Sequence, residues 1–249
     1  MYTSFAQVYD RLMRGVDYAA WAAFYKDLLL EWGVAPGARV AECACGTGNL
    51  TIPLSQTFAM TGIDLSEAML EVAIPKAKAH GRDIRFVRQD MRRLALHKPA
   101  DAVLCTCDGL NYLMTPRQTE EFYQSAYAAL KPGGVLALDV STPYKLEHVL
   151  GSNTLFKAEE DIAYIWQNEW EASRRRVHMQ LDIFAREKDS YRRIVETQSQ
   201  QAHSAQEITA GLEKAGFEQI TLYGDLAREA GARDERMHLM ARKPFTEET

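Results

Sequence analysis

The residues best suited to chemistry form a glycine-containing turn and an acidic residue that follows it. A short apolar run ends at Glu42, Gly46 and Gly48 come next, and helix-compatible sequence follows directly. Glycines in such a turn let backbone N–H groups approach a ligand. Asp64 ends a second apolar run, sixteen residues past Gly48. Two parallel strands joined by a helix bring this carboxylate beside the first turn, where it can accept both hydroxyls of a ribose. The spacing predicts a nucleotide pocket.

The glycine spacing separates two kinds of nucleotide ligand. A dinucleotide fingerprint needs G-x-G-x-x-G, but the third position after Gly46 and Gly48 holds Thr51. The turn instead resembles the acidic-x-G-x-G-x-G turn of class I S-adenosylmethionine-dependent methyltransferases, with Glu42 as the acidic residue and Ala44 replacing the first glycine. This resemblance implies S-adenosylmethionine as the cofactor. The methyl group of Ala44 is expected to be a mild variation.

Further segments resemble the same family, in the same order along the chain. Residues 65–70 look like the start of its second helix, with Ser66 as the N-cap. Residues 86–91 resemble its third strand end, where an Asp takes the adenine amino group, and 100–108 and 130–138 resemble its fourth and fifth strands. The resemblance implies the following cofactor-binding residues: Tyr9, Trp21, Glu42, Ala44, Cys45, Gly46, Gly48, Asp64, Leu65, Met69, Asp90, Met91 and Cys107.

The segment after the predicted fourth strand lies where this family positions the atom to be methylated. Asp108, Asn111 and Tyr112 are therefore expected to bind the substrate, with Asp108 as a candidate proton acceptor. Asp and Asn also favour turns and helix caps, so a structural role is the alternative. No residue is assigned as the catalytic base. The Asn/Asp-Pro-Pro-Tyr signature of nucleobase and glutamine amide N-methyltransferases is absent, which argues against that chemistry.

Alternating strand-like and helix-like segments position these motifs. This alternation predicts a parallel sheet, and the resemblance implies an α/β fold with a Rossmann-like seven-stranded methyltransferase sheet that binds its ligand at the carboxyl strand ends. Pro75 is expected to kink or shorten the second helix. Strands are expected near 39–44, 58–64, 84–88, 100–107, 134–140, 220–223 and 235–241, and helices near 48–56, 66–80, 117–130 and 205–216.

Residues 1–36 are interpreted as an N-terminal helical lid. Aromatic residues recur in them at helical spacing, a pattern that more often reflects core packing. The family resemblance raises the alternative to core packing, in which an N-terminal helix folds over the cofactor. It makes Phe5, Tyr9 and Trp21 the candidate lid residues.

Residues 152–202 alternate with period two, which predicts an inserted antiparallel β cap of three or four strands. The methyltransferase core then comprises residues 37–151 and 203–249. Methyl transfer is an in-line displacement that benefits from a dry, closed site, and a cap over the strand ends suits a small acceptor. In layout the chain resembles bacterial small-molecule methyltransferases, including deoxysugar-amine N,N-dimethyltransferases. This implies N- or O-methylation of a small molecule.

Composition fits an enzyme of this kind. The chain has 249 residues, of which 47% are hydrophobic and 25% charged, enough for a substantial core. No apolar segment is long enough to span a membrane and no signal-peptide pattern is present, so we expect a cytoplasmic protein, monomeric or homodimeric. The net charge of −5 argues against a broad nucleic-acid surface.

Two other functions remain open. An RNA-modifying methyltransferase has only the arginine-rich stretches 82–93 and 174–176 in its support. A non-catalytic S-adenosylmethionine-binding module is consistent with the lack of an assignable base. Arginines at 174–176 and 192–193 are predicted to be solvated; if they curl over the pocket they favour a phosphate- or carboxylate-bearing acceptor.

The cysteines and histidines each have two interpretations. The pairs Cys43-x-Cys45 and Cys105-x-Cys107 end neighbouring predicted strands and could bind a metal. Zinc sites normally use C-x₂₋₄-C turns, however, so buried thiols without a metal are the prediction. His178 and His203 are candidate general bases facing the acceptor, although a structural or solvated role is favoured for each.

Overall fold

A seven-stranded sheet forms the centre of the core in the computed structural model, which describes residues 3–245. The strand order is β10-β11-β5-β4-β1-β2-β3, and β11 runs antiparallel to both of its neighbours. The order reverses between β1 and β4, where such sheets bind ligands at their carboxyl ends. This confirms the expected α/β architecture. The strands are β1 (Arg39–Cys43), β2 (Ala59–Asp64), β3 (Arg85–Arg88), β4 (Ala100–Cys105), β5 (Leu130–Ser141), β10 (Glu218–Tyr223) and β11 (Arg236–Arg242).

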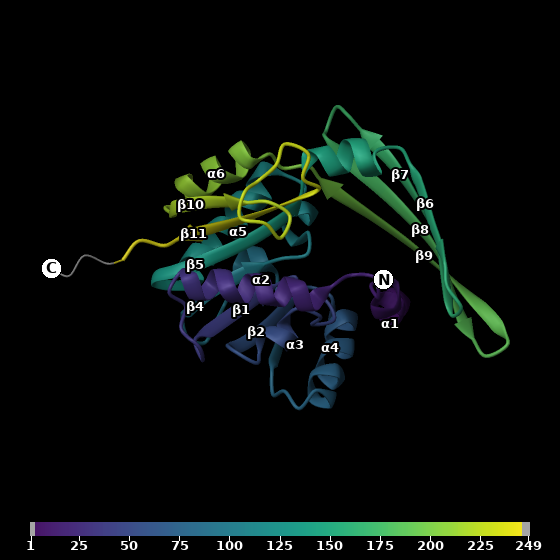
Figure 1. The fold of residues 1–249 in the computed structure, drawn as a ribbon, viewed down its shortest axis with the longest axis horizontal. Helices are drawn as coiled ribbons and strands as arrows, with labels where there is room; N and C mark the ends of the chain where they lie inside the picture. The colour runs from purple at the N-terminus through teal and green to yellow at the C-terminus, as the bar shows by residue number, and fades with distance from the viewer. Residues whose placement is uncertain (1–2, 246–249) are drawn as a thin grey trace.

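Helices cover the two faces of this sheet (Figure 1). On one face, Leu28 of α2 and Leu54 of α3 pack against the sheet, and α4 lies beside them. On the other, Phe122 of α5 and Leu212 of α6 are fully buried. In the described part of the chain, no helix is long and apolar enough to cross a membrane. The helices are α1 (Thr3–Leu12), α2 (Tyr18–Glu31), α3 (Thr51–Leu54), α4 (Glu67–Ala79), α5 (Pro116–Ala129) and α6 (Ala205–Lys214), with short helices η1 (Met91–Arg93), η2 (Gly109–Tyr112) and η3 (Lys145–Leu150).

Side-chain caps set where the helices begin. The Ser66 hydroxyl accepts a hydrogen bond from the Met69 N–H, as expected from the sequence. Thr115 and Ser204 each start a helix with a reciprocal capping box. These caps hold α4, α5 and α6 in place immediately after strands or loops of the core.

The helix expected at 48–56 was wrong, and of the two outcomes expected at Pro75, shortening does not occur. The helix expected at 48–56 is reduced to α3, because Gly48 has a φ of +77° and belongs to the preceding turn. Pro75 does not shorten α4, which continues to Ala79. Pro75 lies on the exposed side of α4, where the carbonyl group that loses its N–H partner can be hydrated.

The second sheet is the inserted antiparallel cap, with strand order β6-β7-β8-β9. It is inserted into the core between β5 and α6. It extends away from the core on the side where α1 lies (Figure 1). Phe5 and Val8 of α1 pack against Ile183 and Ile194 of the cap. The expected cap is confirmed, with four strands: β6 (Thr154–Ala158), β7 (Ile162–Glu171), β8 (Arg176–Glu187) and β9 (Ser190–Gln201).

Candidate active site

A cavity of about 470 Å³ lies at the carboxyl ends of the central strands, and we call it the carboxyl-end pocket. Of the predicted substrate residues, Tyr112 lines it. The other two predicted substrate residues, Asp108 and Asn111, do not line it, and neither do the predicted cofactor residues Trp21 and Gly48. The predicted cofactor residues that line it are Tyr9, Glu42, Ala44, Cys45, Gly46, Asp64, Leu65, Met69, Asp90, Met91 and Cys107.

The turn after β1 brings its backbone to the pocket. Ala44 and Gly46 both have a φ of +53°, in the left-handed region that favours glycine. Ala44 therefore carries a strain of about 1 kcal/mol that a glycine would avoid, which refines the expectation of a mild variation. Gly48 packs closely against the Phe86 ring, since a Cβ at this position would lie 3.3 Å from it.

Asp64 binds backbone groups of two turns at the edge of the pocket, the turn after β1 and the turn after β2. One carboxylate oxygen accepts a hydrogen bond from the Gly46 N–H and the other from the Ser66 N–H, each over 2.8 Å. Burial raises the pKa of Asp64, and these N–H groups partly offset that effect. The carboxylate keeps lone pairs for further donors, because each of its oxygens can accept more than one hydrogen bond. Its predicted role in binding ribose hydroxyls is compatible with this geometry.

Glu42 lies beneath the turn, with 2% of its surface exposed. Its carboxylate accepts hydrogen bonds from the hydroxyls of Thr51 and Thr106, the latter over 3.0 Å. Burial raises the pKa of Glu42 to about 7, despite these two hydroxyl donors. A cationic ligand in the pocket would favour the ionised form.

The raised pKa of Glu42 predicts a pH dependence of the free energy of unfolding. Because the folded-state pKa lies above the ordinary value of 4.5, stability falls as pH rises from about 4.5 to about 7. Glu42→Gln removes this titration and should flatten the profile by about 1–3 kcal/mol over that interval. Denaturant unfolding at pH 5 and pH 8 measures the difference. A variant with the parent's pH profile would contradict the assignment.

The turn after β4 is held by buried charges. The N–H groups of Cys107 and Asp108 donate to the two carboxylate oxygens of Asp139, over 2.8 and 2.9 Å. Both residues have positive φ values, +54° and +67°. Arg236 forms ion pairs of 2.6 Å with Asp108 and with Asp139. Cys107 and Gly109 line the carboxyl-end pocket, so this ion-paired network positions part of its wall.

Asp108 and Asn111 are structural residues rather than the expected substrate contacts. Burial acts to raise the pKa of Asp108, but the Arg236 guanidinium outweighs it and lowers the pKa. The Asn111 side chain is fully buried; it accepts from the Ser141 N–H and donates to the carbonyl groups of Ser141 and Gln201. It joins η2 to β5 and β9. Both side chains therefore bind groups within the protein, although the Asp108 side chain makes no cap hydrogen bond to η2.

Tyr112 stands between two hollows. Its hydroxyl donates to the Gln198 side-chain oxygen of the cap over 2.7 Å, and both residues line the carboxyl-end pocket. The same two residues border a second hollow of about 630 Å³ at the cap, which we call the cap hollow. Its other lining residues come mainly from strands of the cap: Met114, Gln167, Asn168, Glu169, His178, Met179, Gln180, Thr197 and Ser199.

The N-terminal helices close one side of the carboxyl-end pocket. Phe5 and Tyr9 of α1 line it, together with Tyr18 at the start of α2. Burial raises the pKa of Tyr9 and of Tyr18, so both phenols stay neutral. Trp21, one turn after Tyr18, faces the core, where it meets His238 edge-on and stacks under the Arg236 guanidinium at 4.6 Å. Tyr18 takes the place that was expected for Trp21.

Asp10 ties α1 to the glycine turn. One carboxylate oxygen accepts from the Thr47 hydroxyl over 2.6 Å and from the Asn49 amide over 3.0 Å. The other pairs with the Lys76 ammonium of α4 over 2.6 Å. The sequence motif around Tyr9 includes Asp10, but its partners lie 37 to 66 residues away and were not foreseen.

We expect Asp10→Ala to accelerate cofactor release, because α1 loses its polar ties to the turn and to α4. The rate should rise about tenfold or more, since each bond to a charged group contributes about 1.5–3 kcal/mol. Stopped-flow displacement of S-adenosylhomocysteine measures the rate. Asp27→Ala, which removes an exposed carboxylate of α2, is the control. Equal release rates for the two variants would show that Asp10 does not hold the pocket closed.

The end of β3 presents Asp90 and Met91 to the pocket. Arg92 donates to both carboxylate oxygens of Asp90 and, with burial opposing it, lowers the pKa of Asp90. An adenine amino group at this point would share the carboxylate with that guanidinium. The Met91 sulfur lies 3.7 Å from the Cys105 sulfur.

The four cysteines are free thiols at the ends of β1 and β4. Cys43 and Cys105 face each other across the two strands, as the sequence indicated, and both are fully buried. Burial raises the pKa of every one of these thiols. Among residues 3–245, no cluster of three or more His, Cys, Asp or Glu side chains is arranged to hold a metal ion.

The candidate bases and the cap arginines lie outside the carboxyl-end pocket. His203 is buried, hydrogen-bonds the Leu113 carbonyl over 3.1 Å, and has its pKa lowered by burial. His178 bonds the Ser199 hydroxyl over 2.9 Å and borders the cap hollow. Arg175 pairs with Glu207, and Arg192 pairs with Glu187 over 2.7 Å. These arginines do not curl over the pocket.

A parallel sheet with one antiparallel strand, a glycine turn after β1 and a carboxylate at the end of β2 together define a class I S-adenosylmethionine-dependent methyltransferase. Comparisons with known proteins agree. A family model described as a methyltransferase domain matches residues 40–134. The chain is 35% identical to the putative methyltransferase YqeM of Bacillus subtilis (strain 168), with 99% of this chain and 98% of that relative covered. The protein belongs to this enzyme family, and S-adenosylmethionine is its cofactor.

Solved structures show how widely this architecture recurs. An S-adenosylmethionine-dependent methyltransferase from Clostridium acetobutylicum ATCC 824 is 28% identical with a TM-score of 0.89, and the match covers 98% of this chain and 99% of that one. The amino pentose methyltransferase CalS10 from Micromonospora echinaspora, solved with S-adenosylmethionine bound, is 23% identical with a TM-score of 0.76, covering 95% and 96%. The second likeness concerns the fold alone.

Proposed function

We propose that the enzyme transfers a methyl group from S-adenosylmethionine to a nitrogen or oxygen atom of a small-molecule acceptor. The observation that carries this proposal is the closure of the carboxyl-end pocket. Phe5 and Tyr9 of α1 and Gln198 of the cap all line it, together with residues of the core. A site enclosed from three directions favours a small acceptor over a folded RNA or protein.

The cap hollow supplies a route for that acceptor. It shares two lining residues with the carboxyl-end pocket, Tyr112 and Gln198, which are joined by a hydrogen bond. Its lining offers amides and hydroxyls from Gln167, Gln180 and Thr197, which are suited to hydrogen bonding with a polar acceptor.

The residues of this chain act by binding and positioning. S-adenosylmethionine supplies a methyl group activated by its sulfonium. Asp64 would accept the ribose hydroxyls, Asp90 and Met91 would meet the adenine, and the Cys107 turn would border the methyl group. Burial in this pocket excludes water from the line of displacement. An amine acceptor that arrives unprotonated needs no protein base for the displacement itself.

Transfer of a radiolabelled methyl group tests the proposal. The enzyme is incubated with labelled S-adenosylmethionine and separate fractions of a bacterial extract: metabolites below about 3 kDa, total RNA, and protein. We expect label in the metabolite fraction. Label confined to RNA would support the RNA-modifying alternative, and cofactor binding without label in any fraction would support a non-catalytic module.

Tyr112→Phe tests the position of the acceptor. Loss of the bond to Gln198 should lower kcat/KM for the labelled metabolite about fivefold, because one hydrogen bond contributes about 1 kcal/mol, while affinity for S-adenosylhomocysteine stays within about twofold. Tyr191→Phe, at an exposed tyrosine of the cap, is the control. A Tyr112→Phe enzyme with unchanged kcat/KM would place the acceptor elsewhere.

Monomeric or homodimeric assembly and a cytoplasmic location remain predictions.

A further inference from the structure

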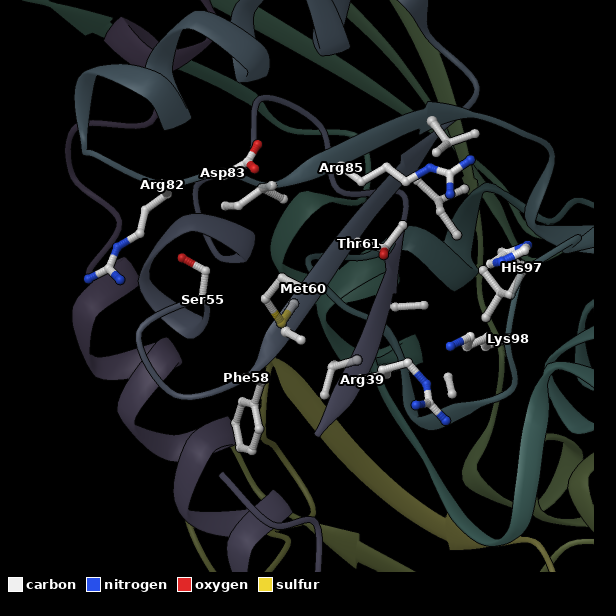
Figure 2. A pocket seen from close by; sticks show the side chains of 18 of the residues that line it. Arg39, Ser55, Phe58, Met60, Thr61, Arg82, Asp83, Arg85, His97 and Lys98 are labelled. Atoms are coloured by element: carbon white, nitrogen blue, oxygen red, sulfur yellow. The ribbon is translucent and has the colours of Figure 1, made fainter. Parts of the chain in front are cut away.

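A third cavity, of about 840 Å³, runs from the amino ends of β1 and β2 along β3 to Gln89, just past the carboxyl end of that strand. We call it the basic crevice. Figure 2 shows Arg39, Arg85, His97 and Lys98 on one side of these strands, around Thr61. Arg82 lies on the other side of the crevice. The methyl-transfer site does not use any of these residues.

Strand register places the basic side chains on one face. Thr61 of β2 pairs with Arg85 of β3 and with Ala41 of β1, so all three share a face of the sheet. Arg39, two residues before Ala41, points to that same face. His97 and Lys98 approach it from the segment that joins β3 to β4.

The crevice is open because the β3–β4 connection forms no long helix. Between Arg88 and Ala100 the chain makes only the short helix η1 and an extended segment. Helices cover this face at β4 and β5, through α5 and α6, but the outer strands are left partly uncovered. A sheet edge of this kind exposes both charged and apolar surface.

Part of the positive charge in the crevice has no acidic partner within the protein. In the described part of the chain, the side chains of Arg82, Arg85 and Lys98 form no ion pair or hydrogen bond. Arg39 is partly balanced: its guanidinium donates to the Pro99 carbonyl over 3.0 Å, and its backbone N–H donates to the Asp101 carboxylate, whose pKa the Arg39 charge helps to lower. Asp83 is the acidic residue on the rim.

Neighbouring arginines outside the crevice, in contrast, form ion pairs with carboxylates. Arg88, three residues after Arg85 on β3, pairs with Glu67 over 3.2 Å, and Arg92 pairs with Asp90. Like charges gathered without counterions repel one another, and a bound anion relieves that repulsion. In a chain of net charge −5, this local positive field would draw an anion to one place.

We propose that the basic crevice binds a phosphate-bearing molecule of nucleotide size. Arginine guanidinium groups recognise phosphate oxygens in a two-pronged fashion, and Lys98 adds a third positive charge. The lining offers apolar surface from Val87 and Leu96 for the uncharged part of such a ligand. The cavity volume falls in the range of small-molecule sites, about 300–1,000 Å³. An extended RNA strand would need a longer basic track than these residues provide.

The crevice and the carboxyl-end pocket share one residue. Gln89 lines both, and its side chain exchanges hydrogen bonds with the backbone of Ala95, over 3.0 and 3.1 Å. The test therefore needs a saturated cofactor site. It also needs a probe without adenine, which the carboxyl-end pocket is expected to bind.

Titration calorimetry with uridine 5′-diphosphate, in the presence of saturating S-adenosylhomocysteine, tests the proposal. Arg85→Gln/Lys98→Gln removes two charges from the crevice and leaves shorter, polar side chains. We expect one site in the parent and an affinity at least about tenfold lower in this variant, because hydrogen bonds to charged groups dominate phosphate binding. Arg175→Gln/Arg192→Gln, which removes two exposed arginines of the cap, should bind the probe as the parent does.

Four outcomes would overturn the proposal. The parent could fail to bind uridine 5′-diphosphate, or the crevice variant could bind it with the parent's affinity. Loss of binding in the cap variant alone would place the probe at the arginines of the cap. A 20-nucleotide RNA that binds the crevice and is not displaced by uridine 5′-diphosphate would make the site an RNA contact. Unchanged affinity of the crevice variant for S-adenosylhomocysteine serves as the check on its folding and on the methyl-donor site.

Discussion

Asp64→Ala is expected to weaken S-adenosylmethionine binding at least about a hundredfold. The carboxylate would accept the two ribose hydroxyls, and each hydrogen bond to a charged group contributes about 1.5–3 kcal/mol. The variant also leaves the Gly46 and Ser66 N–H groups without their acceptor, which loosens the turn that contacts the ligand. Both effects act in the same direction. Calorimetric titration with S-adenosylmethionine measures the loss.

Asp64→Asn separates the two effects. The amide keeps one oxygen for the backbone donors but loses the negative charge, so we expect an affinity between those of the parent and Asp64→Ala. Thermal unfolding without ligand reports how much the turn itself is weakened. If Asp64→Ala binds S-adenosylmethionine as tightly as the parent, the ribose does not contact this carboxylate.

Arg236→Met is expected to lower the free energy of unfolding by about 3–5 kcal/mol. Arg236 is 8% exposed and pairs with Asp108 and Asp139, of which Asp139 has no exposed surface. Removing one partner of a buried ion pair leaves an uncompensated charge, and this is among the most destabilising of single changes. Denaturant unfolding at pH 7 measures the change.

Arg228→Met is the matched control for this prediction. Arg228 pairs with Glu31, but both side chains are more than half exposed, and exposed pairs contribute about 0–1 kcal/mol. A similar loss of stability in both variants would mean that the buried network around Asp139 is not special. The cofactor affinity of Arg236→Met should also fall, because Asp139 holds the Cys107 turn at the pocket.

The part of the site that depends on local order could be predicted from the sequence. Glu42, Gly46 and Asp64 each stand at the end of an apolar run or in the turn that follows it, and parallel strands carry such residues to one edge of the sheet. The period-two pattern of residues 152–202 likewise identified the cap, because alternation is a property of each strand on its own.

Residues whose role depends on distant partners could not be placed in this way. Asp108 was expected to face the acceptor, but it faces Arg236, which lies 128 positions later in the chain. Trp21 and Tyr18 are both aromatic and lie within one turn of each other, and nothing in their spacing says which faces the pocket. The fold decides it, because His238 and Arg236 of β11 provide a surface that Trp21 covers.

The basic crevice shows a similar limit. The arginines between residues 82 and 93 form one stretch in the sequence, but the structure divides them. Arg88 and Arg92 pair with carboxylates, whereas Arg82 and Arg85 line an open hollow with residues of two other segments. The hollow is exposed because the connection between β3 and β4 forms only the short helix η1.

A crystal structure with S-adenosylhomocysteine tests most directly whether the carboxyl-end pocket is the methyl-donor site. We predict the ribose hydroxyls within hydrogen-bond distance of the Asp64 carboxylate, the adenine beside Asp90 and Met91, and the sulfur facing Tyr112 and the cap. Ligand density at any other cavity, or a ribose turned away from Asp64, would contradict this assignment.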